Sequence, residues 1–199
     1  MALERTADTL DIRCLCLDVD GVLTDGRVYW DDRGQGTRAF HVHDGFALRW
    51  FQRLGGVVVL CSGKTSEAVA ARARELEIAH VVQGSRDKVG DLERVLTPLN
   101  LRFEQVAVLG DDLPDVPLLK RCALPMAVAN AVDEVKRVAR LVTKRSGGDG
   151  AVREAVEYVL RASGRWSEVL RHYGLPTPET PAVDRPTACQ RSAAERDAR

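Results

Sequence analysis

Two aspartates, Asp18 and Asp20, follow directly on a mostly apolar run and stand just before Gly21. If that run is a strand, side-chain alternation sends both carboxylates to the same side at its end. Two carboxylates so close together disfavour each other's ionisation, and a hard divalent cation such as Mg²⁺ compensates for them. A turn capped by an aspartate pair is the alternative interpretation of these residues taken alone.

Two later apolar runs also end in polar residues that could join this pair. One ends in Ser62 and Gly63, and the other ends in a glycine followed by Asp111 and Asp112. Because ligands gather beyond the carboxyl ends of parallel strands, all three run ends are expected to converge on one site. A hydroxyl and the N–H groups of a helix start suit phosphate, whereas carboxylates suit a metal ion.

Two lysines are candidates for contacting a phosphorylated ligand. Lys88 opens a predicted helix, where the helix dipole disfavours a cation; binding a phosphate would explain its position, and a solvated surface lysine is the alternative. Lys64 lies in Gly63-Lys64-Thr65, which looks like the end of a P-loop. The first glycine of that loop is replaced by Val58, which excludes nucleotide binding by this route.

The elements that must position these residues alternate along the chain. Short apolar runs bounded by turn residues predict strands, and helical patterns lie between them. Such units build a Rossmann-like α/β fold, with a parallel sheet and helices on both faces. The predicted strands are Ile12–Leu17, Val57–Cys61, Val81–Val82, Val106–Leu109 and Met126–Val128. The predicted helices are Phe46–Leu54, Ser66–Leu76, Val89–Leu99, Pro117–Cys122, Val132–Arg140 and Val152–Leu160.

A chain of 199 residues supports one core, and we predict one domain over residues 11–165 after an N-terminal extension at 1–10. Residues 27–43 have the composition of a β-hairpin, an insertion too small to be a cap domain. His41 and His43 would lie on one face of its second strand, but two imidazoles alone do not complete a metal site. Residues 174–199 contain too few apolar residues to form an ordered structure. Their composition therefore predicts a disordered tail.

Composition excludes several classes of protein. Lys and Arg number 29 and are balanced by 29 Asp and Glu, so no basic surface for nucleic acid is expected. No run approaches the ~18 to 20 apolar residues of a membrane span, and no export signal is recognisable. The five cysteines form an odd set without C-x-x-C spacing, which favours reduced thiols in the cytoplasm.

The segments around Asp18, Ser62, Lys88 and Asp111 resemble the four motifs of the haloacid dehalogenase superfamily and follow one another in the same order. The resemblance covers roughly residues 10 to 165. Within that superfamily, the chain resembles the 3-deoxy-D-manno-octulosonate 8-phosphate phosphatase family. The segments behind that narrower match are Asp25-Gly-Arg-Val-Tyr, Phe40-His-Val-His-Asp44-Gly45, Gln83-Gly84 and Gly147-Gly-Asp-Gly-Ala-Val-Arg153-Glu154. That family usually has Thr-Gly-Arg where this chain has Ser62-Gly63-Lys64, and lysine lacks the bidentate fork of arginine.

The resemblance implies magnesium-dependent hydrolysis of a sugar-acid phosphate through an aspartyl phosphate, in lipopolysaccharide biosynthesis. Its implied roles are nucleophile for Asp18, acid and base for Asp20, phosphate binding for Ser62, Gly63 and Lys88, substrate contact for Lys64, and metal binding for Asp18, Asp20, Asp111 and Asp112. Asp115 is expected to orient Lys88 or its loop, and a role for Arg153 stays open. The resemblance also implies a homotetramer assembled through the hairpin.

The sequence leaves two alternative functions open. A nonulosonate 9-phosphate phosphatase of the sialic-acid type would share all the catalytic residues. A non-catalytic oligomerisation module of the same fold is the second alternative, although intact Asp18, Asp20, Lys88 and Asp111 argue against it.

Overall fold

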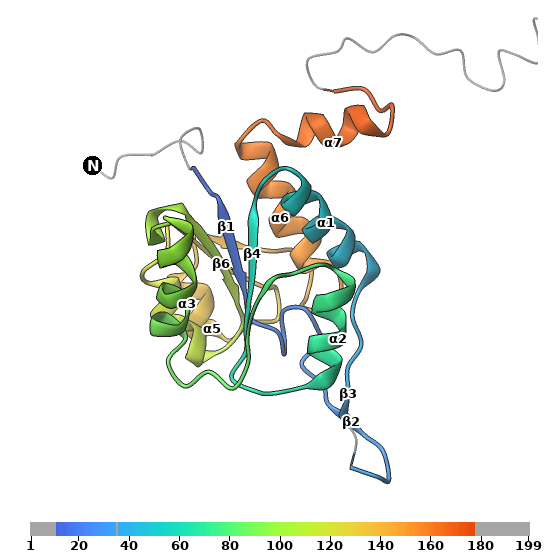
Figure 1. Cartoon of the computed structure of the whole chain (residues 1–199), viewed down its shortest axis with the longest axis vertical. Helices are drawn as coiled ribbons and strands as arrows, with labels where there is room; N and C mark the ends of the chain where they lie inside the picture. The colour runs from blue at the N-terminus through green and yellow to red at the C-terminus, as the bar shows by residue number, and fades with distance from the viewer. Residues whose placement is uncertain (1–10, 35, 178–199) are drawn as a thin grey trace, which may run out of the picture. The chain divides into compact units, whose positions relative to one another are not determined.

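The computed structural model describes residues 11–34 and 36–177 (Figure 1). The chain divides into one compact unit that ends at Arg165 and a second that begins at Trp166. The predicted N-terminal extension, 1–10, and most of the predicted tail, 174–199, lie outside the described residues.

A six-stranded parallel sheet forms the centre of the first unit, with the strand order β5-β4-β1-β6-β7-β8. β1 lies between β4 and β6, and all four of its residues are buried. An unbroken apolar sequence is typical of a parallel strand that is covered on both faces. The strands are β1 (Cys14–Leu17), β4 (Val57–Cys61), β5 (His80–Val82), β6 (Val106–Gly110), β7 (Leu124–Ala127) and β8 (Leu141–Val142).

Helices cover both faces of this sheet, so the predicted Rossmann-like α/β fold is confirmed. Figure 1 shows α3 and α5 on one side and α1, α2 and α6 on the other. α1 packs against α6, and α4 packs against α3 and α5. The helices are α1 (Val42–Arg53), α2 (Glu67–Glu75), α3 (Lys88–Leu96), α4 (Val116–Leu119), α5 (Asp133–Val138), α6 (Ala151–Ala162) and α7 (Trp166–His172). None of the described helices combines the length and the apolar character needed to cross a membrane.

The predicted hairpin is shorter in the structure than in the sequence prediction. β2 (Tyr29–Trp30) pairs antiparallel with β3 (Gly36–Thr37), and α1 already begins at Val42. The prediction of a strand that places His41 and His43 on one face is therefore wrong. His41 is the N-cap of α1, and its Nδ1 accepts a hydrogen bond from the backbone N–H of His43 at 3.2 Å. This cap outweighs the local alternation of apolar residues because it satisfies a backbone donor of the first helical turn.

Among the described β-strands and α-helices, β8 and α7 were not predicted from the sequence. β8 has only two residues, too few to show a period of two. α7 lies in the second unit, between the predicted domain and the predicted tail.

Candidate active site

Neighbouring strands bring the predicted site residues to one edge of the sheet. Asp18 follows β1, Ser62 follows β4 and Asp111 follows β6. Asp18 is fixed to the adjacent strand end, since its backbone N–H donates to Leu109 O at 3.1 Å. A cavity of about 470 Å³ opens at this edge. Its lining includes all the site residues that were predicted from the sequence, namely Asp18, Asp20, Ser62, Gly63, Lys64, Lys88, Asp111 and Asp112.

The turn after β1 is held by a buried hydroxyl and by a glycine. Thr24 Oγ1 accepts from the N–H of Gly21 at 3.3 Å and from that of Gly26 at 3.2 Å, and it donates to Val19 O at 3.3 Å. Gly21 has a φ of +106°, and a methyl group there would overlap the Asp111 carboxylate. Glycine at this position therefore both allows the turn and lets Asp111 approach the backbone beside the aspartate pair.

Lys88 lies between two carboxylates at the start of α3. Its Nζ lies 2.5 Å from Asp18 Oδ1 and 2.6 Å from Asp115 Oδ1, and only 8% of its side chain is exposed. Burial lowers the pKa of Lys88, but the two carboxylates outweigh it and raise the pKa above the ordinary range. Lys88 is therefore a permanent cation in the floor of the cavity.

Asp115 is buried, and both of its oxygens are engaged. Oδ1 accepts from Lys88, and Oδ2 accepts from the backbone N–H of Asp111 at 3.0 Å and of Asp112 at 3.4 Å. These contacts orient both the lysine and the loop that carries Asp111.

The carboxylates of Asp18, Asp111 and Asp115 form the acidic cluster of the site. One oxygen of each lies within 4.8 Å of the others. Burial raises the pKa of Asp18 to about 6, with Asp115 adding to the rise and Lys88 opposing it. Burial also raises the pKa of Asp111 to about 7, and the neighbouring carboxylates add to the rise. Buried oxygen donors with this excess of negative charge fit a hard divalent cation.

Asp112 lies in the same cavity but outside that cluster. It is exposed, and its Oδ1 accepts from the Leu113 N–H at 2.8 Å as the N-cap of a short 3₁₀ turn. The structure thus groups Asp115, rather than Asp112, with Asp18 and Asp111.

We predict that Asp111→Asn stabilises the metal-free protein and abolishes its response to Mg²⁺. Because the folded pKa lies above the unfolded value, the stabilising contribution of Asp111 is present at low pH and is lost as the pH rises through about 7. In EDTA at pH 8, the variant should unfold ~2–4 °C higher for each kcal/mol saved by no longer burying the charge of Asp111 beside other carboxylates, and this gain should shrink at pH 5. Thermal unfolding with EDTA or Mg²⁺ measures both effects, with the exposed Glu104→Gln as control. A lower midpoint for Asp111→Asn in EDTA at pH 8 would contradict the prediction.

The segment after β4 brings a buried hydroxyl and an exposed lysine to the cavity. Ser62 is buried, its Oγ accepts from the Lys64 N–H at 3.1 Å, and its carbonyl accepts from the Ser85 N–H at 3.0 Å. Gly63 and Lys64 are exposed at the cavity mouth.

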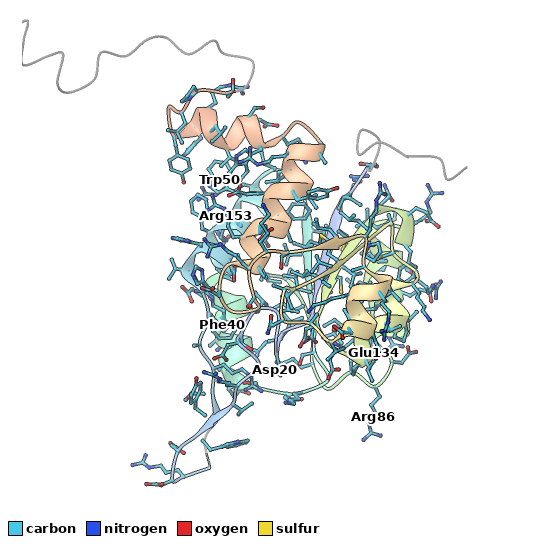
Figure 2. All side chains as sticks on the ribbon, turned by 180° about the vertical axis from the view of Figure 1, so that it is seen from behind. Asp20, Phe40, Trp50, Arg86, Glu134 and Arg153 are labelled. Carbon is cyan, nitrogen blue, oxygen red and sulfur yellow. The ribbon has the colours of Figure 1, made fainter. Side chains whose placement is uncertain are left out.

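Arg38 is a residue of the site that sequence reasoning missed. Its Nε donates to Asp20 Oδ1 at 2.6 Å, and its Nη1 donates to Ser66 Oγ at 2.7 Å. No local pattern marks it, because it precedes a helix whose start was itself misplaced. Arg38 contacts the site through Asp20 without lining the cavity, and Arg153 does not line the cavity either. Its backbone N–H donates to the buried Asp44 at 2.7 Å, and Figure 2 shows Arg153 well apart from Asp20.

Several known proteins resemble this chain in sequence and in fold. A family model for haloacid dehalogenase-like hydrolases matches residues 61–155, a range that includes Ser62, Lys88 and Asp111. The 3-deoxy-D-manno-octulosonate 8-phosphate phosphatase KdsC of Escherichia coli K12 is 38% identical over 168 residues, which are 84% of this chain and 89% of that protein. The Yersinia pestis protein of the same name is 37% identical over 163 residues, 82% of this chain and 86% of that protein.

A solved structure extends the likeness to three dimensions. The crystal structure of 3-deoxy-D-manno-octulosonate 8-phosphate phosphatase from Moraxella catarrhalis, in complex with a magnesium ion, a phosphate ion and a KDO molecule, matches with a TM-score of 0.80 at 32% identity. The match covers 82% of this chain and 94% of that chain.

Proposed function

Since the chain belongs to the 3-deoxy-D-manno-octulosonate 8-phosphate phosphatase family of haloacid dehalogenase-like hydrolases, we propose that it hydrolyses 3-deoxy-D-manno-octulosonate 8-phosphate to the free sugar acid and phosphate. The reaction is a magnesium-dependent phosphoric monoester hydrolysis. The observation that carries the proposal is the convergence of Asp18, Lys88 and Asp111 in one cavity of a chain with these relatives. A non-catalytic module would gain little from burying these charges together.

Asp18 is the proposed nucleophile. Its carboxylate attacks phosphorus, the bond from phosphorus to the sugar oxygen breaks, and an aspartyl phosphate forms. Asp20 gives a proton to the departing sugar oxygen. Lys88, already 2.5 Å from Asp18, places a positive charge beside the phosphoryl oxygens, and Ser62 and the Gly63 N–H supply further donors.

The second half of the reaction regenerates both aspartates. A water molecule attacks the phosphorus of the aspartyl phosphate, and the bond to Asp18 breaks. Asp20 accepts the proton of that water and so recovers the proton that it gave away. In the structure the Asp20 carboxylate pairs with Arg38, whereas Lys88 contacts Asp18 and Asp115.

Asp18, Asp111 and the backbone carbonyl of Asp20 would hold Mg²⁺, with Asp112 in support. When bound, the ion neutralises the negative charge of the carboxylates and of the transferring phosphoryl group. Lys64, exposed at the cavity mouth, is proposed to contact the sugar acid, whose carboxylate attracts a cation.

The substrate assignment is tested by phosphate release from a panel. It contains 3-deoxy-D-manno-octulosonate 8-phosphate, a nonulosonate 9-phosphate and glucose 6-phosphate, each with Mg²⁺ or with EDTA. We expect the highest kcat/KM for the 8-phosphate and no release in EDTA. A preference for the 9-phosphate would overturn the substrate assignment and leave the chemistry standing, whereas no release from any of them would favour a non-catalytic module.

We further propose that the hairpin assembles a homotetramer. Trp30 is 71% exposed, Tyr29 is 49% exposed and Val42, at the start of α1, is 76% exposed. Aromatic side chains are enriched at protein interfaces, and a two-stranded hairpin is marginal unless it packs against something. A second copy of the hairpin would supply that packing.

Trp30→Arg is expected to lower the oligomeric mass, because a charge in place of the indole opposes burial. Light scattering after size exclusion should give the mass of four chains for the natural sequence and a smaller mass for the variant. Val142→Arg, on the exposed end of β8, should keep the tetramer. A natural protein that runs as a monomer would refute the assembly.

We also propose that the reaction takes place in the cytoplasm, as a step of lipopolysaccharide biosynthesis. The cysteines within the described residues, Cys14, Cys16, Cys61 and Cys122, are free thiols, which agrees with a reducing compartment. Fractionation of cells, with the phosphatase activity followed in each fraction, tests the location.

A further inference from the structure

Arg38 reaches the catalytic carboxylate from the segment between β3 and α1. Its side chain is 6% exposed and that of Asp20 is 13% exposed, so the pair is largely shielded from water. The Nε to Oδ1 distance is 2.6 Å, whereas Nη2 lies 3.5 Å from Oδ2. Arg38 is not among the residues that line the cavity, so it approaches Asp20 from outside the substrate space.

A second contact fixes the guanidinium itself. Ser66 is the N-cap of α2, yet its hydroxyl makes no capping bond to the helix and instead accepts from Arg38 Nη1 at 2.7 Å. The backbone N–H of Ser66 donates to Gln83 Oε1 at 2.7 Å, which ties this position to the segment after β5. An N-cap serine normally bonds the backbone of its own helix, so its use for Arg38 indicates that the arginine is anchored on both sides.

We infer that Arg38 is a positioning residue for proton transfer by Asp20. The tight contact immobilises Oδ1, and the long contact leaves Oδ2 as the oxygen that gives and takes the proton. A carboxylate that is free to rotate would spend less time aimed at the sugar oxygen, and such losses of orientation slow a reaction strongly. Arg38 thus acts on the reaction through Asp20, without touching the substrate.

Leaving-group dependence separates this role from a general structural role. The constant kcat/KM reports the steps up to formation of the aspartyl phosphate. A sugar oxygen needs a proton to leave, whereas p-nitrophenolate leaves as a stable anion. Loss of Asp20 positioning should therefore slow an alkyl phosphate and spare p-nitrophenyl phosphate.

For Arg38→Met we expect kcat/KM for the sugar-acid phosphate to fall by ~10 to 100-fold, within the range that general acid catalysis contributes, and that for p-nitrophenyl phosphate by less than about 3-fold. Arg38→Lys keeps the charge and should recover part of the loss. Ser66→Ala removes only the second anchor and should give the same pattern at smaller size, even if Arg38→Met does not fold. Arg137→Met, at an exposed arginine on α5 that pairs with Glu134, is the control and should leave both constants unchanged.

Equal losses on the two substrates, or no loss on either, would overturn the assignment of Arg38. The inference rests on the proposed function, but its test does not depend on the named substrate. If the 8-phosphate is not hydrolysed, the proposed substrate is wrong, and the comparison with p-nitrophenyl phosphate is made on whichever sugar phosphate of the panel reacts fastest.

Discussion

Asp18→Asn is expected to lower kcat by at least about 10⁴-fold, because an amide cannot attack phosphorus and the covalent route is lost. The substitution preserves the shape of the side chain. The protein should therefore fold, and its far-UV circular dichroism should match that of the natural sequence. This is the largest effect on activity that we predict for a single substitution.

Detection of the aspartyl phosphate intermediate is a second test of Asp18→Asn. Acid-quenched natural enzyme should carry one phosphoryl group on the peptide that contains Asp18, and hydroxylamine should remove it, since an acyl phosphate is cleaved by that nucleophile. Asp18→Asn should carry none. Asp133→Asn, an exposed aspartate on α5, serves as the control and should retain full turnover. Comparable turnover in Asp18→Asn and the natural protein would contradict the assignment of Asp18 as the nucleophile.

Lys88→Met is expected to cost both activity and stability. Loss of the cation removes the proposed hydrogen-bond donor to the phosphoryl group, and removal of one such electrostatic donor typically costs ~10²–10³-fold in rate. It also leaves Asp18 and Asp115 buried and facing each other without their shared partner, which destabilises by about 3–5 kcal/mol. Lys120→Met, an exposed lysine just after α4, should change neither quantity.

The stability loss of Lys88→Met should depend on pH. Burial and Asp115 raise the pKa of Asp18 while Lys88 lowers it, so without the lysine the pKa should rise above about 6. In EDTA, the destabilisation should be largest near pH 8 and should shrink as the pH falls and the carboxylates take up protons. Denaturant unfolding at several pH values measures it.

A double substitution tests the physical cause of that loss. In the Asp115→Asn background, Lys88→Met leaves one fewer buried charge unpaired. We expect the two substitutions to be non-additive by at least about 1 kcal/mol, as is usual for residues within one ion-pair network. Additive effects would show that the lysine contributes through packing and not through its charge.

The buried carboxylates of the site therefore lower the stability of the fold. Burial raises the pKa of Asp18 to about 6 and that of Asp111 to about 7, so both aspartates are costly to ionise where they stand. One lysine balances part of this charge, and the rest makes the site receptive to a divalent cation.

Periodicity and spacing were enough to predict five of the six strands of the parallel sheet and the order of the site residues along the chain. The bounds of β4 agree with the predicted Val57–Cys61, because a buried apolar run ended by turn residues is a local signal. The placement of Asp18, Ser62 and Asp111 at one edge followed from the geometry of parallel strands, which requires no knowledge of side-chain contacts.

The pairing of those residues depends on tertiary contacts. Lys88 and Asp18 are separated by 70 positions, and Arg38 and Ser66 by 28, so nothing in the local sequence reports their contacts. The start of α1 at Val42 was likewise hidden, since a histidine cap competes with an apparent strand pattern. The position of each group just after a strand is a local property of the sequence, and it fixes which groups reach the edge of the sheet. Their partners, and hence their orientation and charge balance, depend on packing between elements distant in the chain.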